Sequence, residues 1–216
     1  WIESEKWDLI VTMDDATSEI YSAFFVDEEG TMSSMRGVKD VIESKGLFST
    51  FYSDRGSHYW HTPEAGGKVD KTNPTQFGEA LKQLNINMIA AYSPEARGRS
   101  ERMFGTLQGR LPNELKLHNI QDMDSANSFL KDKFIPEFNT LFTVEPQDNQ
   151  PAFIPWLPCH LSLDDILCLK EQRTVYKDNT VKYKGKTLQL FKTQYRYSYA
   201  KTTVMVHEYA NNEMAI

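Results

Sequence analysis

The chain has 216 residues, of which 40% are hydrophobic, and a formal net charge of −6. This length suits one large or two modest domains, and this hydrophobic content is enough for a packed core, so we expect a globular protein. No apolar run approaches the roughly 18–20 residues of a membrane span, which argues against a membrane protein. The two cysteines, Cys159 and Cys168, lack the spacing of a zinc site or of a disulfide framework, and they favour a reducing cytoplasm.

The charge is distributed unevenly along the chain. Residues 161–216 carry nine Lys or Arg against six Asp or Glu, whereas residues 1–160 carry fifteen against twenty-four. This asymmetry indicates an acidic body followed by a basic module. An acidic body is compatible with a metal-dependent nuclease, because carboxylates that bind metal lower the net charge while local arginines still contact phosphate.

Hydrophobic patterns in the first two thirds of the chain predict strands that alternate with helices. A continuous apolar run predicts a buried strand at 8–16, and an aromatic, β-branched run predicts its hairpin partner at 19–27. A helix is expected at 31–46, where apolar positions at helical spacing end at Gly46. Strands are further expected at 48–54 and 86–93, and a loop at 61–76. The other expected helices are at 76–85, at 97–117 with a kink or break at Pro112, and at 125–142 with Pro136 near its middle.

The last third of the chain differs in composition. Four prolines between residues 144 and 158 predict a linker, which we place at 144–160. After it, short strand-like segments separated by turns predict a small antiparallel β-barrel at 161–216. In residues 1–143, hairpin strands followed by strand–helix crossovers imply a mixed sheet covered by helices, so the expected fold class is α/β.

Candidate catalytic carboxylates occur in three short patterns. Asp14 and Asp15 lie near the end of the first strand in MDDATS, Asp54 ends a later strand in YSDRGS, and Glu101 lies early in a helix. Two Mg²⁺ ions about 3.5–4 Å apart catalyse phosphoryl transfer, and Mg²⁺ prefers carboxylate oxygens. Because the chain between Asp54 and Glu101 can leave and return to the same sheet edge, we expect these two acids to hold Mg²⁺ or Mn²⁺.

Arginines surround Glu101 in SPEARGRSERM. They are Arg97, Arg99 and Arg102. Successive residues on a helix diverge by about 100°, so Glu101 can face a metal ion while an arginine contacts a DNA phosphate. The proline and glycine that precede the helix suit a mobile loop that grips substrate.

FYSDRGS and AAYSPEARGRSERMFGTLQGRL resemble the second and third acid motifs of DDE transposases and retroviral-type integrases, in particular bacterial insertion-sequence transposases with an integrase core. The resemblance covers residues 7–142 and implies an RNase H-like core, with Asp54 as the second catalytic acid and Glu101 as the third. It also implies two metal ions, DNA cleavage and strand transfer as the activity, transposon ends and target DNA as partners, and a homo-oligomer on DNA.

In this family the first acid lies on a strand that comes before the hairpin. We therefore expect that strand, with its Asp, upstream of residue 1, and we expect the chain alone to be poorly stable or inactive. Asp14 and Asp15 belong to the next strand and are interpreted as structural or near-site residues. The separation of Asp54 and Glu101 exceeds that of the best-known family members, and the loop at 61–76 accounts for the excess.

Several of these residues also have simpler interpretations. DDATS is typical of a hairpin turn whose side chains cap backbone amides. His58 and His61 are spaced either for a metal ion or as a solvated pair. Tyr59 and Trp60 either stack on an unpaired base or anchor their loop on the core.

Two functional alternatives to a transposase remain open. One is a catalytically inactive nucleic-acid-binding module on an RNase H-like core, and the other is an RNase H-like nuclease without joining activity. In the tail, basic residues interleaved with tyrosines favour a DNA surface over a merely solvated sheet face. The candidate DNA contacts there are Lys184, Lys186 and Arg196.

Overall fold

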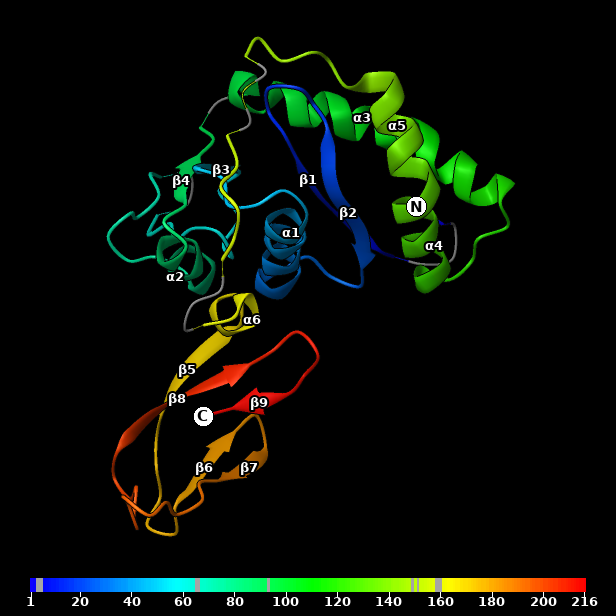
Figure 1. Cartoon of the computed structure of the whole chain (residues 1–216). Coiled ribbons are helices and arrows are strands. Elements are labelled where there is room, and N and C mark those ends of the chain that lie inside the picture. The colour runs from blue at the N-terminus through cyan, green and yellow to red at the C-terminus, as the bar shows by residue number, and fades with distance from the viewer. Residues whose placement is uncertain (3–5, 65–66, 93, 149, 151, 158–160) are drawn as a thin grey trace. The chain divides into compact units, whose positions relative to one another are not determined.

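The computed structural model describes residues 1–2, 6–64, 67–92, 94–148, 150, 152–157 and 161–216, without side chains for 94–97. The chain divides into two compact units, Trp1–Pro158 (unit 1) and Cys159–Ile216 (unit 2). Unit 1 contains the elements from β1 to α5, and unit 2 contains those from α6 to β9 (Figure 1). The mixture of strands and helices confirms the predicted α/β class. None of the described helices combines the length and the apolar character needed to span a membrane.

β1 (Asp8–Met13) and β2 (Ile20–Val26) form an antiparallel hairpin. Leu9 belongs to the core cluster on one face of the hairpin, and on the other face helix α1 (Thr31–Ser44) packs closely. A Cβ on Gly37 of α1 would lie 2.8 Å from the Oγ1 of Thr12. Helices therefore cover both faces of the hairpin, which explains the continuous apolar run of β1.

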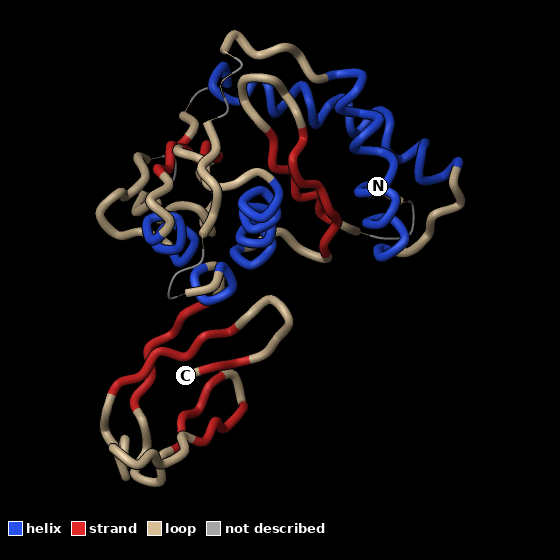
Figure 2. The backbone as a smooth tube through the Cα atoms, viewed as in Figure 1, coloured by secondary structure: helices blue, strands red, loops and turns tan. Residues whose placement is uncertain are grey.

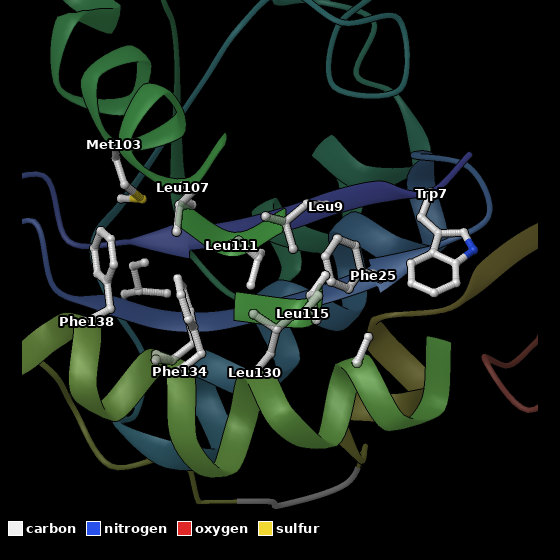
Figure 3. Close-up of a cluster of buried hydrophobic side chains, with 13 residues drawn as sticks. Trp7, Leu9, Phe25, Met103, Leu107, Leu111, Leu115, Leu130, Phe134 and Phe138 are labelled. Atoms are coloured by element: carbon white, nitrogen blue, oxygen red, sulfur yellow. The ribbon is translucent and has the colours of Figure 1, made fainter. Parts of the chain in front are cut away.

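The core of unit 1 lies between the hairpin and three helices, α3 (Pro94–Leu117), α4 (Met123–Phe129) and α5 (Ile135–Phe142). Figure 3 shows the side chains of α3 directed at those of the hairpin and of the later helices. A spacing of about four residues places the apolar side chains of α3 on one face. The cluster includes Trp7, Leu9, Phe25, Met103, Leu107, Leu111, Leu115, Leu130, Phe134 and Phe138.

Two prolines lie inside helical segments, with different outcomes. α3 runs through Pro112 without ending, so of the predicted kink or break the break does not occur. Leu111 and Leu115 are buried on either side of the proline. Between α4 and α5 the π-helical turn η1 (Leu130–Phe134) ends two residues before Pro136. The wider turn accommodates a proline ring that would clash with the carbonyl four residues earlier in a regular α-helix.

Two asparagines seal the outer edge of β2. The side-chain amide of Asn127 accepts from the N–H of Phe25 at 2.6 Å and donates to its carbonyl at 3.1 Å. Asn139 makes the same pair of bonds with Ile20, at 2.9 and 2.8 Å. Because these side chains occupy backbone groups that a further strand would need, β2 ends the sheet on this side.

We expect Asn139→Ala to destabilise unit 1 by about 1–3 kcal/mol, because it leaves the N–H and C=O of the buried Ile20 unpaired. Urea unfolding followed by circular dichroism measures the change in the free energy of unfolding. Asn113→Ala is the matched control, since the Asn113 amide is exposed and donates to the carbonyl of Gly109 in its own helix. Equal effects of the two substitutions would contradict a structural role for the Asn139 clamp.

The second sheet of unit 1 pairs β3 (Thr50–Ser53) with β4 (Asn87–Ala90) in parallel. Helix α2 (Gln76–Gln83) lies in the crossover between them, and Thr75 caps its first turn by accepting from Gly78. The predicted glycine stop after α1 is confirmed: Gly46 has φ +111°, and a Cβ there would collide with the carbonyl of Ile154.

No hydrogen-bonded ladder joins β1–β2 to β3–β4 in the described part of the chain. The mixed sheet expected from the sequence is thus two separate two-stranded sheets. Part of the expected linker lies against unit 1, because Leu47 and Ile154 exchange backbone hydrogen bonds of 2.7 and 2.9 Å.

Unit 2 contains a short helix and two antiparallel sheets, seen as red strands in Figure 2. Its ladders do not close into a barrel among the described residues. The first strand of unit 2 begins at Leu169. The unpredicted helix α6 begins at a Ser162–Asp165 capping box, a signal that the sequence carries. The elements are α6 (Leu163–Ile166), β5 (Leu169–Thr174), β8 (Thr203–Glu208) and β9 (Met214–Ala215) in one sheet, and β6 (Thr180–Tyr183) with β7 (Lys186–Gln189) in the other.

Candidate active site

A cavity of about 670 Å³ lies between the two sheets of unit 1. Every residue from Asp8 to Asp15 and from Thr50 to Asp54 lines it. Side chains of a strand alternate between faces, so a cavity lined by consecutive residues runs along the strand edge. In the described chain β1 pairs only with β2 and β3 only with β4. The cavity therefore separates the unpaired edges of β1 and β3.

The hairpin register shows which backbone groups of β1 point into this cavity. Phe25 directs its N–H and C=O outward, to Asn127, and Leu9 lies directly opposite Phe25. In an antiparallel pair, the N–H and C=O groups of two directly opposite residues either point towards each other or both point away from the partner strand. The N–H and C=O of Leu9, and by the same alternation those of Val11, are thus directed at the cavity.

Asp54 follows β3 directly, as predicted, and lines the cavity. β3 and β4 are parallel, and the N–H of Ala91 donates to the carbonyl of Ser53 at 2.8 Å, so both strands end together. α3 begins at Pro94, just beyond the end of β4. One oxygen of Asp54 accepts from the N–H of Gly56 at 2.8 Å, which fixes the side chain in a tight turn.

The aromatic residues after Asp54 anchor their loop on the core. Trp60 is only 7% exposed, and its indole N–H donates to the Oγ of Ser53 at 2.9 Å. Tyr59 packs against Phe51 and Phe77. Burial, together with the nearby charges of Glu29 and Asp54, raises the pKa of Tyr59 to about 12. Of the two interpretations of this pair, anchoring agrees with these contacts.

Glu101 lies on α3 beside the face that borders the cavity. Ser100, Phe104 and Gln108 line the cavity, whereas Glu101 is exposed and is not one of the lining residues. At 100° per residue, Glu101 points within about 20° of Gln108 around the helix axis. It therefore stands at the margin of the cavity-facing stripe. The four-residue spacing of Ser100, Phe104 and Gln108 is the sequence signal that could have identified the face of α3 that lines the cavity.

The arginines near Glu101 make local contacts. Arg99 forms an ion pair with Asp15 at 3.0 Å and also donates to the Asp15 carbonyl. Arg102 donates to the carbonyl of Gly98 at 3.0 Å. The side chain of Arg97 lies outside the described part of the structure. The first two turns of α3 are thus tied to the β1–β2 turn by an exposed ion pair.

Asp14 and Asp15 have structural roles and also line the cavity. Asp14 accepts from the N–H and the hydroxyl of Thr17, at 3.0 and 2.7 Å, so DDATS forms the capped hairpin turn. His58 lies 3.3 Å from a carboxylate oxygen of Glu29, and His61 forms an isolated bridge with Asp70.

The cavity is acidic. Asp8, Asp14, Asp15, Glu29 and Asp54 line it, and none of its described lining residues is Lys or Arg. Carboxylate oxygens are the donors that Mg²⁺ prefers, so the chemistry of the donor set fits Mg²⁺ or Mn²⁺. Among the residues that the structure describes, however, no three His, Cys, Asp or Glu side chains are grouped closely enough to hold an ion. A metal at Asp54 therefore needs further ligands to approach.

The basic residues predicted in the tail are all exposed in unit 2. Lys184 is ion-paired with Glu208 at 2.8 Å, and Tyr183 donates to the same carboxylate at 2.7 Å. Hydrogen bonds from Lys184 and, with a smaller effect, from Tyr183 lower the pKa of Glu208 below its usual value. Lys186 begins β7, and Arg196 lies in the loop between β7 and β8, with its guanidinium 4.8 Å from the ring centroid of Tyr199.

The chain can be compared with known proteins. No family model matches it. It is 31% identical over 220 residues to a putative transposase, y4bF, of Sinorhizobium fredii, in an alignment that covers 100% of this chain and 47% of that protein. It is also 31% identical over 142 residues to the transposase for insertion sequence IS1202 of Streptococcus pneumoniae, covering 66% of this chain and 30% of that protein.

The chain is similar to transposases. This similarity confirms the resemblance to transposases that the motifs indicated, and the chain spans about half the length of y4bF and less than a third of the IS1202 protein. A chain in the cryo-EM structure of the simian T-cell lymphotropic virus intasome in complex with PP2A regulatory subunit B56 gamma matches with a TM-score of 0.52. That match has 18% identity and covers 85% of this chain and 60% of the other. It supports a shared α/β fold.

Proposed function

We propose that this chain is part of a DDE transposase that catalyses metal-dependent DNA cleavage and strand transfer. The observation that carries the proposal is the position of Asp54. It lies at the carboxyl end of β3, on an acidic cavity that is also bordered by β1 and α3. The similarity to transposases, which covers the whole chain in one case, supports the same function.

In the proposed reaction, water attacks the phosphorus at a transposon end, the bond from phosphorus to the 3′ oxygen breaks, and that oxygen leaves as a 3′-hydroxyl. This hydroxyl then attacks a phosphodiester of target DNA, and a target 3′-hydroxyl leaves. Asp54 and Glu101 would hold two Mg²⁺ or Mn²⁺ ions in the active complex. When bound, such ions activate the attacking oxygen and stabilise the charge of the leaving oxygen.

The arginines of α3 would position the DNA. Arg102 diverges from Glu101 by about 100° around the helix axis, so it can contact a phosphate while Glu101 faces the cavity. Arg99 would exchange its exposed ion pair with Asp15 for a phosphate, because an exposed pair contributes little stability. Arg97 would add a third contact.

We also propose that the first catalytic Asp lies on a strand from the polypeptide upstream of Trp1, placed between β1 and β3. Backbone groups of Leu9 and Val11 point into the cavity along one edge, and β3 supplies the other edge. Such a strand would join the two sheets into one RNase H-like mixed sheet. It would also bring a third carboxylate towards Asp54, as a metal site requires.

Unit 2, with its two small antiparallel sheets, would contact DNA through Lys184, Lys186 and Arg196. The proposed partners are transposon ends and target DNA, bound by a homo-oligomer. Residues 179–207 contain six Lys or Arg and no Asp or Glu, which suits a polyanionic partner.

Gel analysis of products formed by the full-length protein from labelled end DNA and plasmid target tests the proposed function. A transposase is expected to give both cleaved ends and joined products. Cleavage without joining would instead identify a nuclease. Binding without any product would identify a catalytically inactive nucleic-acid-binding module, an alternative motivated by the lack of three grouped metal-binding side chains among the described residues.

A further inference from the structure

The segment 191–199 of unit 2, here called the aromatic loop, exposes large rings to solvent. Phe191, Tyr195 and Tyr197 are 82%, 89% and 76% exposed. Unit 2 has other aromatic residues that its fold does bury, such as Tyr183 at 4%. Three large rings exposed within seven residues concentrate apolar area on one short segment, and exposed apolar area marks interaction sites when it is concentrated.

The aromatic loop is held in place by a buried asparagine. Asn179 is 6% exposed, and its side chain accepts from the N–H of Tyr199 at 2.8 Å and donates to the carbonyl of Tyr197 at 3.3 Å. Its backbone carbonyl accepts from the N–H of Leu190 at 2.9 Å. Both ends of the loop are thus fastened at one residue.

The tip of the aromatic loop is also a defined turn. Thr193 and Arg196 exchange backbone hydrogen bonds of 3.0 and 3.3 Å, and the guanidinium of Arg196 donates to the carbonyl of Ser198 at 3.1 Å. The backbone of the loop is therefore ordered before binding, which reduces the conformational entropy that is lost when the rings bind a partner.

The charge of the loop selects the class of partner. Lys192 and Arg196 alternate with the exposed rings, and no acidic residue occurs between Asp178 and Glu208. Rings interleaved with cations suit a partner with flat apolar faces and negative charge. Single-stranded nucleic acid has both, because its bases are unstacked and its backbone carries phosphates. Duplex DNA offers the phosphates but keeps its base faces covered.

We propose that the aromatic loop binds unpaired nucleotides of DNA, with Phe191, Tyr195 and Tyr197 stacking on bases and Lys192 and Arg196 contacting phosphates. This inference shares its substrate class with the proposed function and goes beyond it, because binding can be measured without any catalysis. It also differs from a general DNA surface, since it requires rings and free base faces.

Fluorescence anisotropy of the 216-residue chain with labelled oligothymidylate, and with a labelled duplex, tests the proposal. Tyr195→Ala and Tyr197→Ala are each expected to raise the Kd for the single strand by roughly five- to a hundredfold. The same changes should alter the Kd for the duplex by less than about twofold, because phosphate contacts remain. Tyr195→Phe keeps the ring and is expected to bind as the unchanged chain does.

Tyr176→Ala is the matched control, since Tyr176 is 52% exposed in unit 2 but lies outside the loop. Circular dichroism checks that each variant folds. Unchanged single-strand binding by both alanine variants, or equal losses for single strand and duplex, would overturn the proposal. Binding of oligothymidylate is measured without any cleavage or joining, so a failure of the proposed catalysis and a failure of this inference appear in separate assays.

Discussion

Replacing Asp54 with Asn in the full-length protein is expected to lower the rates of DNA cleavage and strand transfer by about a thousandfold or more. The amide cannot supply the charge that holds a divalent ion, and a thousandfold loss corresponds to roughly 4 kcal/mol of transition-state stabilisation. Gel-based assays with Mg²⁺ measure both steps. Glu101→Gln is expected to give a loss of similar size.

The fold should survive both substitutions. Asp54 accepts a turn hydrogen bond from Gly56 that an Asn oxygen can also accept, and Glu101 is exposed. Asp132→Asn, at an exposed carboxylate of η1, and Glu114→Gln, on the same helix as Glu101, are controls that should retain activity. Full activity of Asp54→Asn would remove the basis for the proposed transposase site.

The second large expected effect is a gain in stability when an upstream strand fills the cavity between the edges of β1 and β3. A chain extended upstream, as in the full-length protein, is expected to have a unit 1 that is more stable by about 3–6 kcal/mol, the contribution of about two buried apolar side chains. Comparison of urea unfolding of the extended chain with that of residues 1–216 measures this difference. An equal free energy of unfolding for the two chains would mean that no upstream strand fills this cavity.

The substitution Val11→Pro tests whether the added stability comes from a strand that pairs with β1 or from another cause. The N–H of Val11 points into the cavity, and proline removes it. In a free edge strand proline is tolerated, whereas in a central strand it removes a ladder hydrogen bond. The substitution should therefore destabilise the extended chain clearly more than residues 1–216. Equal destabilisation of both chains would argue against a strand paired with β1.

Local patterns in the sequence were sufficient to predict most elements of unit 1. The apolar spacing of α3 and the stop at Gly46 are consequences of nearby residues, so they are readable along the chain. The passage of α3 through Pro112 was not predictable, because buried packing on both sides of the proline overrides its local cost. The start of β5 at Leu169 likewise depends on pairing with β8, which lies far away in the sequence.

The candidate site was predictable only in part. The parallel pairing of β3 and β4 brings Asp54 and the start of α3 to one end of the sheet, as the order of elements suggested. The Asn127 and Asn139 clamps were missed, because nothing local links these residues to β2, more than a hundred positions earlier. The acidic lining contributed by Asp8 and Glu29 was missed for the same reason.

The central claim is that Asp54, which directly follows β3, holds a catalytic metal ion together with Glu101. The most direct test is a crystal of the full-length protein grown with Mn²⁺ and measured at a wavelength where manganese scatters anomalously. We predict an anomalous peak within coordination distance of carboxylate oxygens of both Asp54 and Glu101. Well-ordered Asp54 and Glu101 side chains too far apart to share an ion, with no peak at either, would contradict the claim.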